Sequence, residues 1–294
     1  MPILLDRLLL DLITANSRKN HNSKGSKLMS TVYFSESCSR KEFVTQIMEV
    51  YHRSWQKATK VFVKPNVVSY ELYPTTTHPE VLEAVLDRLS GREIVVGDAP
   101  AIDAGRSGRI LQKSPLKKIC DAHGAQFVNL YSEKMKTMQS MRGYKVKVST
   151  VPLTCDYVIS LPVLKAHGTV GLSSALKNQF GYLSKQDRLL MHCRIKNINK
   201  GIVEANVAVP TDLFIVDAIE IMKGAQECRH GGCPAKLGTM LGGTDPVSLD
   251  MFGLQLLRKL EPSLVDEKNP AMRYVEYASS IGLGKKVFEA KSLL

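Results

Sequence analysis

Apolar and polar positions follow two different periods along the chain from residue 60 onward. Short runs that are almost entirely apolar and β-branched are typical of strands buried on both faces of a sheet. Strands of this kind are predicted at 60–64, 93–98, 126–130, 156–162 and 213–217, with a partly exposed one at 144–148. Stretches with helically spaced apolar residues lie between or after them, at 79–90, 108–123, 198–208, 246–260 and 270–282. This succession predicts an α/β fold with a mainly parallel sheet and helices on both faces.

One segment, DYVISLPVLKAHGTVGLSSALKNQFG at 156–181, places reactive side chains directly after a buried strand. The apolar run ends ahead of Lys165 and His167, which are expected in the loop beyond the strand. In open α/β sheets, ligands bind outside the carboxyl ends of the strands. The segment therefore predicts part of a binding site.

A helix is predicted after Gly168. Its apolar stripe consists of Leu172, Leu176 and Phe180. Lys177 lies off this stripe, so it either faces solvent or points into a cleft. A lysine held near other cations loses its proton more easily and becomes a nucleophile or base. Imidazole titrates near neutral pH, so His167 and His192 are candidates for paired acid and base roles.

Polar side chains recur at the carboxyl ends of the predicted strands. They are Lys64 with Asn66, Asp98, Lys165 with His167, Asp217 and Asp245. A doubly wound sheet gathers these ends along one edge, so residues far apart in sequence are expected to converge on one ligand. Asp98 and Asp217 have an alternative interpretation as N-caps of the following helices. His78, which precedes a proline at a helix start, has the same alternative.

The predicted site has a catalytic set and a substrate-binding set. The catalytic set is Lys165, His167, Lys177 and His192. The substrate-binding set is Lys64, Asn66, His78, Asp98, Asn178 and Asp217. In this hypothesis the lysines hold negative charge, the histidines move a proton and the carboxylates orient them.

Several nucleotide-binding and hydrolase motifs are missing from the sequence. No G-x-G-x-x-G follows a strand and no G-x-x-x-x-G-K-[ST] occurs, so neither a Rossmann cofactor nor a P-loop nucleotide is supported. The G-x-S-x-G elbow and the H-E-x-x-H helix are absent too, which argues against a serine hydrolase and a zincin. The cofactor stays unknown at this point.

The chain of 294 residues carries 40 Lys and Arg against 28 Asp and Glu, a net charge of +12. A field of this sign attracts small anions, nucleic acid or a membrane surface. Aromatic residues make up only 6%, and no basic tract carries interleaved aromatics as a stacking platform requires. A small anionic ligand is therefore favoured over nucleic acid. Because no apolar run of about 18 residues occurs, no membrane span is predicted.

Six cysteines are scattered through a chain large enough to fold without disulfides, which predicts free thiols and a cytoplasmic location. Only Cys228 and Cys233 are close in sequence, with His230 between them. They form a candidate metal or redox site, with a glycine-rich turn carrying incidental thiols as the alternative. An intrinsic iron-sulfur cluster is not expected, because such clusters take cysteine ligands at closely spaced, repeated positions.

Residues 1–28 differ from the rest of the chain and are predicted to be an extension of an α/β domain at 29–294. Leucines at 4, 5, 8, 9 and 12 follow a helical spacing, and 17–27 is polar, basic and linker-like. The segment does not match a signal peptide, because no positive charge precedes its apolar part and acidic residues interrupt it. Two interpretations stay open: a peripheral helix, or an upstream start ahead of a domain that opens at Met29.

Six blocks in a fixed order resemble one known family. They are VKPN at 63–66, TTTHPEVLEAVLD at 75–87, VVGDAP at 95–100, DYVISLPVLKAHGTVGLSSALKNQFGYL at 156–183, IVDAIEIMKG at 215–224 and GGTDPVSLD at 242–250. On these motifs the chain, over about 59–260, resembles the prokaryotic family called domain of unknown function 362. The resemblance implies a possible electron-transfer partner, since many members carry ferredoxin-type iron-sulfur modules. It also implies a distant likeness to the fold of the nickel-pincer lactate racemases.

The sequence supports three hypotheses about function. The first is a cytoplasmic enzyme, racemase-like, isomerase-like or redox-associated, that acts on a small anionic substrate or cofactor through Lys and His acid-base chemistry. The second is a non-catalytic accessory protein that transfers an iron-sulfur or metal cofactor, or takes part in electron transfer. The third is an anion or nucleic-acid binding module, suggested by charge alone.

Overall fold

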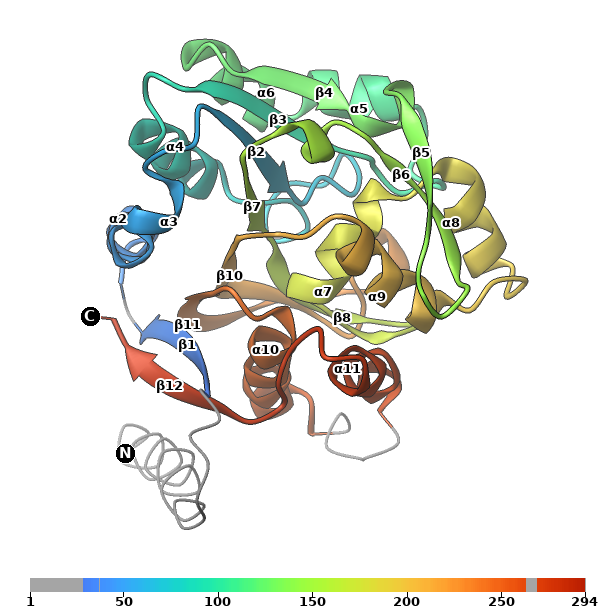
Figure 1. Ribbon diagram of the computed structural model, residues 1–294. Coiled ribbons are helices and arrows are strands. Elements are labelled where there is room, and N and C mark those ends of the chain that lie inside the picture. The colour runs from blue at the N-terminus through green and yellow to red at the C-terminus, as the bar shows by residue number, and fades with distance from the viewer. Residues whose placement is uncertain (1–28, 37, 263–268, 294) are drawn as a thin grey trace.

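The computed structural model describes residues 29–36, 38–262 and 269–293 (Figure 1). The predicted extension at 1–28 lies outside the described residues. The strands of the main sheet are β1 (Ser30–Glu36), β2 (Lys60–Pro65), β3 (Glu93–Asp98), β4 (Gln126–Asn129), β7 (Tyr157–Leu161), β8 (Val163–His167), β9 (Gly171–Ser173), β10 (Leu213–Lys223), β11 (Cys233–Gly243) and β12 (Phe288–Ser292). A separate hairpin consists of β5 (Met135–Gln139) and β6 (Lys145–Ser149).

The helices are α2 (Arg40–Val50), α3 (His52–Trp55), α4 (Pro79–Arg88), α5 (Ser107–Lys113), α6 (Pro115–Ala122), α7 (Ala175–Asn178), α8 (Lys185–His192), α9 (Ile198–Ala208), α10 (Pro246–Leu260) and α11 (Pro270–Ser280). Short 3-10 turns are η1 (Leu130–Ser132), η2 (Pro152–Thr154), η3 (Gln179–Tyr182) and η4 (Cys228–His230).

The described strands form one large mixed sheet in the order β12-β1-β11-β10-β7-β2-β3-β4, with β8 and β9 attached beside β10. The run from β10 through β7, β2 and β3 to β4 is parallel throughout. The antiparallel ladders among the described strands are those of β11 with β1 and β10, and the β8–β9 and β5–β6 hairpins. The predicted α/β class with a mainly parallel sheet is confirmed.

Each central strand sends alternate side chains to opposite faces of the sheet, as an extended chain must. On β2, Val61 and Val63 join a buried cluster with side chains of α2, α4, α5 and α6. Phe62, between them, joins the cluster on the other face, to which α7, α9, α10 and α11 contribute. Helices therefore cover both faces, as predicted, with the sheet between them (Figure 1).

The direction in which the chain winds along the sheet reverses between β2 and β7. From β2 it crosses to β3 and β4 through α4, α5 and α6. From β7, the other neighbour of β2, it proceeds to β10 through α7, α8 and α9. The two sets of connections lie on opposite faces and diverge at the carboxyl ends of β2 and β7. Doubly wound sheets bind their ligands at such a switch point.

One predicted helix is divided in two. The segment 108–123 forms α5 and α6, because Ser114 is extended, with φ −64° and ψ 135°, and Pro115 begins a new helix. A residue before proline is biased toward this extended conformation, so the break has a local cause. The predicted helices at 198–208 and 246–260 are found with the same bounds.

The helix predicted after Gly168 is wrong over its first part. Residues 171–173 form strand β9, and the helix α7 covers only Ala175–Asn178. Gly171 has a φ of +79°, a left-handed conformation that glycine adopts readily, and it follows the tight turn out of β8. The apolar residues of the predicted stripe are all buried, but a strand and a 3-10 turn share them with the helix.

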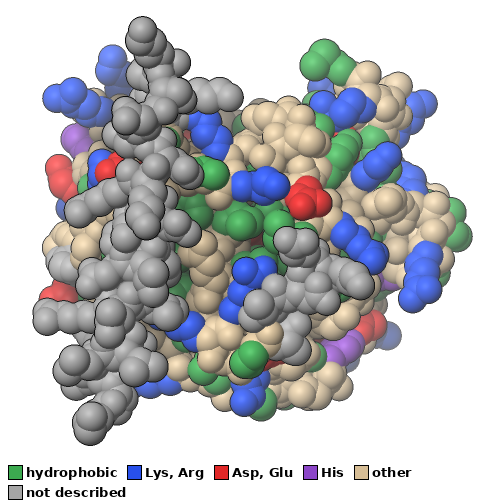
Figure 2. Space-filling model, turned by 90° about the horizontal axis from the view of Figure 1, so that it is seen from below, with side chains coloured by type: hydrophobic (Ala, Val, Ile, Leu, Met, Phe, Trp, Pro, Cys, Tyr) green, Lys and Arg blue, Asp and Glu red, His purple; other side chains and the backbone are tan. Residues whose placement is uncertain are grey.

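Basic side chains are dispersed over the face of the molecule seen in Figure 2. Lys and Arg groups occur at several places there, with apolar and uncharged groups between them. Within the described ranges, no helix is long and apolar enough to cross a membrane.

Candidate functional site

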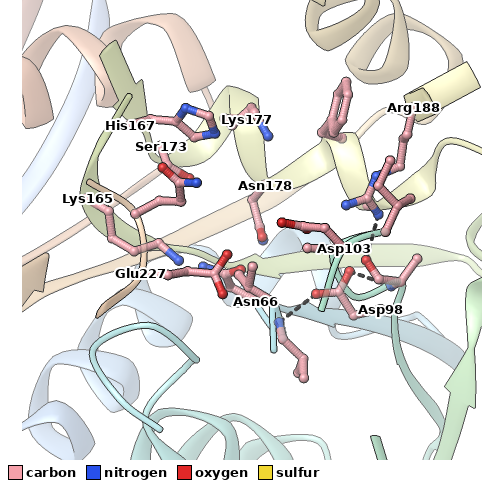
Figure 3. Close-up of a pocket in the computed structure, with 18 of the residues that line it drawn as sticks. Asn66, Asp98, Asp103, Lys165, His167, Ser173, Lys177, Asn178, Arg188 and Glu227 are labelled. Atoms are coloured by element: carbon pink, nitrogen blue, oxygen red, sulfur yellow. Dashed lines mark hydrogen bonds between the residues drawn. The ribbon is translucent and has the colours of Figure 1, made fainter. Parts of the chain in front are cut away.

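A cavity of about 360 Å³ lies at the switch point, at the carboxyl ends of β2 and β3 and beside β8 (Figure 3). A volume of this size suits a small molecule. The predicted catalytic residues Lys165, His167, Lys177 and His192 all line it. Lys64, Asn66, Asp98 and Asn178 from the predicted substrate-binding set line it as well. The winding of the sheet thus brings together side chains from four separate segments.

The floor of the cavity is a buried ion pair between neighbouring strands. Lys64 on β2 donates from Nζ to Asp98 Oδ1 on β3 at 2.5 Å and to Pro65 O at 3.0 Å. Asp98 also accepts from the backbone N–H groups of Val67 and Ala99, at 2.6 and 2.7 Å. Burial lowers the pKa of Lys64, and the charge of Asp98 opposes that shift. Because the two charges offset each other, Lys64 is not the free cation that the sequence predicts, and Asp98 is not a helix N-cap.

Gly181 lets the backbone of η3 close over this ion pair. A Cβ atom at this position would overlap Asp98 Oδ1 and lie 2.7 Å from Lys64 Nζ. Gly181→Ala is therefore expected to lower the free energy of unfolding by about 1–3 kcal/mol, as overpacking does, in urea denaturation. Gly108→Ala on α5 is the control, because nothing lies within 4 Å of its Cβ position. Equal losses for the two variants would show that the close approach at Gly181 is unimportant.

Lys165 and His167 lie on a strand, β8, rather than in the loop predicted after β7. Pro162, which lacks a backbone N–H, separates the two strands. Beyond it, β8 pairs with β10 on one side and β9 on the other. Lys165 is 1% exposed and donates from Nζ to Thr75 O at 2.7 Å. Burial lowers the pKa of Lys165 to about 8, and the carboxylate of Glu227 opposes that shift.

His167 presents a hydrogen-bond donor to the cavity. Its Nδ1 faces the backbone N–H groups of Thr169 and Val170, at 3.2 and 3.4 Å, and accepts from them. The neutral ring therefore carries its proton on Nε2. Burial, followed by the charges of Lys177 and Lys165, lowers the pKa of His167 well below its usual range. A neutral imidazole of this kind suits the stabilisation of an oxyanion better than proton abstraction.

The opposite wall of the cavity gathers cations around the ring of Phe180. Lys177 Nζ lies 4.2 Å from the ring centroid, and the guanidinium carbon of Arg188 lies 5.3 Å from it. Burial, then the charges of Arg188 and Lys165, lowers the pKa of Lys177 to about 7. His192, whose ring centroid is 6.0 Å from that of Phe180, has a pKa lowered by burial and by Lys177. The pKa of the lysine on this wall therefore lies near neutrality, and the acid and base roles of His167 and His192 stay predictions.

Arg188 is a site residue that the sequence prediction missed. Its side chain is 7% exposed, and Nη1 donates to Ala99 O at 2.7 Å. Its Nε is buried and has no hydrogen-bond partner among the described residues. Arg188 precedes His192 by one helical turn on α8, so the i, i+4 spacing was the signal that could have found it.

Three cations of the cavity have no carboxylate within ion-pair distance in the described parts of the chain. They are Lys165, Lys177 and Arg188. Figure 3 shows Lys165 on one side of the cavity, Arg188 on the other and Lys177 between them. Cations that converge on one cavity without a paired carboxylate favour the binding of a negative charge there.

The short helix α7, which bears the lysine of this wall, is held from behind. Asp250 on α10 accepts from the backbone N–H of Leu176 at 3.4 Å, and Asn206 on α9 donates to Leu176 O at 2.9 Å. Asn178 donates from Nδ2 to Ser160 Oγ on β7 at 2.9 Å. The amide nitrogen of Asn178 therefore anchors α7 to the sheet. Only the side-chain oxygen Oδ1 is then available for the predicted role of Asn178 in substrate binding.

The loop between β10 and β11 covers one side of the cavity. Its Glu227, 1% exposed, binds Arg229 at 2.7 Å, and Arg229 also binds Asp103 at 2.9 Å. Glu71 accepts from the backbone N–H groups of Cys228 and Arg229, at 2.8 and 2.9 Å. Glu227 and Asp103 line the cavity and both pair with Arg229, and the charge of Glu227 also acts on Lys165. Sequence reasoning missed both acids, because their roles depend on contacts between distant loops.

His78 and Asp217 do not line the cavity, so their predicted roles in substrate binding are not supported. Asp217 lies in the middle of β10 rather than at its end, and accepts from Arg40 Nε at 2.7 Å and Tyr73 Oη at 2.9 Å. His78 is the N-cap of α4, with Nδ1 accepting from the backbone N–H of Glu80 at 3.2 Å. The alternative interpretation of His78 as a capping residue is confirmed.

Asp245 and the cysteines of the β10–β11 loop also take no part in the cavity. Asp245 is the N-cap of α10 and accepts from two backbone N–H groups of its first turn, at 2.9 and 3.0 Å. Cys228 and Cys233 are free and exposed, and only His230 of the proposed metal ligands lines the cavity. Among residues 29–36, 38–262 and 269–293, no three His, Cys, Asp or Glu side chains are grouped to hold a metal ion. The donors at 228, 230 and 233 therefore do not fit a metal or an iron-sulfur cluster.

Fold and cavity together define an α/β protein with a cationic pocket at the carboxyl edge of its parallel strands. The chain belongs to the family described as Domain of unknown function (DUF362), whose model matches residues 61–255. The resemblance inferred from the six sequence blocks is confirmed.

A thylakoid-associated protein of Synechocystis sp. is 26% identical over 214 residues. The match covers 70% of this chain and 65% of that relative, so the chain spans less than two thirds of the relative's length. Among solved structures, the lactate racemase apoprotein from Thermoanaerobacterium thermosaccharolyticum matches 88% of this chain and 59% of its own, with 12% identity and a TM-score of 0.48. A Thermotoga maritima protein matches 83% and 60%, with 13% identity and a TM-score of 0.42. At these scores the structural likenesses support no conclusion about activity.

Proposed function

We propose that this protein is an enzyme that binds a small anionic substrate or cofactor in the cavity and moves a proton on it. The observation that carries the proposal is the convergence of Lys165, Lys177 and Arg188 on one cavity, without a carboxylate in ion-pair distance among the described residues. Lysines and arginines that only keep a protein in solution do not need to converge on one cavity. Burying cations without counter-charges costs free energy, and a bound anion offsets that cost.

The roles of the cavity residues follow from their charge states near neutral pH. Arg188 keeps its charge, and Lys165, with a pKa of about 8, is largely protonated at pH 7, so these two hold the anion. Lys177, with a pKa of about 7, exchanges a proton readily and is the base. His167 donates from Nε2 to an oxygen that gains charge during the reaction. Lys177 is therefore the group that moves the proton, and His167 acts as a neutral hydrogen-bond donor.

The alternative functions receive less support from the described residues. A cavity of about 360 Å³ admits a small molecule but no nucleic-acid strand, and the basic side chains visible in Figure 2 form no continuous patch. The hypothesis of an electron-transfer partner depends on the family resemblance alone, so we do not include it in the proposal. We place the protein in the cytoplasm, because its six cysteines are free thiols among the described residues.

The test measures the binding of small anions by calorimetry. Inorganic phosphate, oxalate, pyruvate and citrate are titrated into the wild-type protein, and the tightest of them is then titrated into Lys165→Met. Methionine keeps the length of the buried side chain and removes its charge and hydrogen bonds. The affinity is expected to fall on the order of 10–100-fold, the usual value of a charged hydrogen bond.

Lys60→Met is the matched control, because Lys60 lies at the other end of β2 and pairs with Glu93 outside the cavity. Its affinity for the same anion is expected to equal that of the wild-type protein. Failure of all four anions to bind, or equal affinities of Lys165→Met and the wild type, would contradict the proposed function.

A further inference from the structure

Lys177 differs from the other lysines of the cavity in what surrounds its amine. Lys64 is paired with Asp98 at 2.5 Å, and Lys165 donates to a backbone carbonyl at 2.7 Å. The Nζ atom of Lys177 lies instead over an aromatic ring, 4.2 Å from the centroid of Phe180. In the described ranges no hydrogen bond or ion pair engages it. Its lone pair is therefore free whenever the amine is unprotonated.

The surroundings of Lys177 raise the fraction of its amine that is unprotonated near pH 7. Burial lowers its pKa most, and the positive charges of Arg188, Lys165 and Lys64 lower it further, to about 7. An exposed lysine, with a pKa of about 10.4, has on the order of a thousandfold less free amine at pH 7. The side chain is half-buried and lines the cavity, so a ligand there can reach it. A free amine beside fixed cations is a nucleophile for a carbonyl group on an anionic molecule.

We propose that Lys177 is the nucleophile of the site and forms an imine with the aldehyde or ketone carbonyl of an anionic substrate. The inference rests on the proposed function, because Lys165 and Arg188 must hold the carboxylate or phosphate of that molecule. The substrate class is thus narrowed to small oxo acids and phosphorylated carbonyl compounds.

The step balances without an external oxidant or reductant. The lone pair of Lys177 Nζ attacks the carbonyl carbon, a C–N bond forms and the carbonyl π pair moves to oxygen. His167 donates from Nε2 to that oxygen, and the ammonium of Lys165 supplies the proton that converts it into a leaving hydroxyl. The attacking nitrogen returns one proton to Lys165 and passes its other proton to the hydroxyl, so that the C–O bond breaks, the C=N bond forms and one water leaves. Amine plus carbonyl gives imine plus water, with no change in oxidation state.

The test traps the imine by reduction. The full-length protein is incubated at pH 7 with pyruvate or with glyceraldehyde 3-phosphate and sodium cyanoborohydride, whose hydride converts the imine into a stable secondary amine. Peptide mapping by mass spectrometry then locates the adduct. We expect Lys177 to be modified at least about tenfold more than any other lysine, given its larger fraction of free amine.

Lys177→Arg is the decisive variant, because arginine keeps the positive charge but is not a nucleophile at this pH. It is expected to lose the adduct, while its circular dichroism spectrum stays that of the folded wild type. Lys185→Arg, an exposed change on α8, is expected to leave the adduct in place.

Modification spread over exposed lysines, or centred on Lys165, would overturn the inference. Binding of anions by the wild type without any adduct on Lys177 would overturn the imine and leave the proposed function standing. Failure of every anion to bind would remove both.

Discussion

Asp98→Asn is expected to lower the free energy of unfolding by about 3–5 kcal/mol, the usual cost of breaking a buried ion pair by removing one partner. The substitution keeps the shape of the side chain and removes its charge. Lys64, 1% exposed, would then lack a counter-charge in the floor of the cavity. Urea denaturation followed by circular dichroism measures the loss.

The same two strands offer a matched control. Lys60 and Glu93 pair at 2.6 Å at the opposite end of β2 and β3, but their side chains are 31% and 56% exposed. Glu93→Gln is expected to change stability by less than about 1 kcal/mol, because solvent screens an exposed pair. A second check is Lys64→Met in the Asp98→Asn background, which should recover part of the loss. Similar losses for Asp98→Asn and Glu93→Gln would refute the importance of burial.

Lys177→Met is expected to stabilise the protein at pH 6 by about 1–3 kcal/mol, after allowance for partial exposure, and to give a shrinking gain as the pH rises toward 10. The pKa of Lys177 is about 7 in the folded protein, below that of an unfolded lysine. Between those values the unfolded chain binds more protons, so the wild type gains stability with rising pH and loses it on acidification. Below about pH 7 Lys177 is protonated in both the folded and the unfolded protein. The folded protein is then destabilised by the whole free energy of desolvating the ammonium.

Denaturation curves at pH 6, 8 and 10 for the wild type and the variant measure this difference. Using the value at pH 10 as the baseline removes the effect of repacking by methionine. Lys185→Met, with its side chain exposed at the start of α8, is expected to show no such trend. A difference between Lys177→Met and the wild type that is constant across pH would contradict the account of Lys177.

The sequence predicts where the site lies better than it predicts what each residue does there. Buried apolar runs give the strands, and parallel winding then places their ends on one edge. Lys64, Lys165 and His167 meet at the cavity for this reason. Asp217 does not, because β10 continues for six residues beyond it and pairs with β11. The alternating pattern of AIEIMK after Asp217 was a sign of that continuation.

The features of the site that the sequence does not predict depend on contacts between segments far apart in the chain. Whether Lys64 is free or neutralised depends on Asp98, 34 positions away. The neutral state of His167 follows from the cations around it and from two backbone N–H groups after β8. Arg188 comes from α8, and its guanidinium lies over the rings of Tyr131 in η1 and Phe180 in η3. The local sequence pattern indicates that Arg188 lies on the same helix face as His192, but not which rings and carbonyl group it contacts.

The central claim is that Lys165, Lys177 and Arg188 converge on the cavity without paired carboxylates in the described ranges. The pKa of Lys177 in the folded protein tests this claim most directly. Carbon-13 labelling of lysine Cε followed by an NMR pH titration reads it, and Lys177→Arg identifies the signal. The account predicts a midpoint of about 7, moving upward when phosphate is added. A midpoint near the ordinary lysine value of about 10.4, unchanged by phosphate, would contradict it.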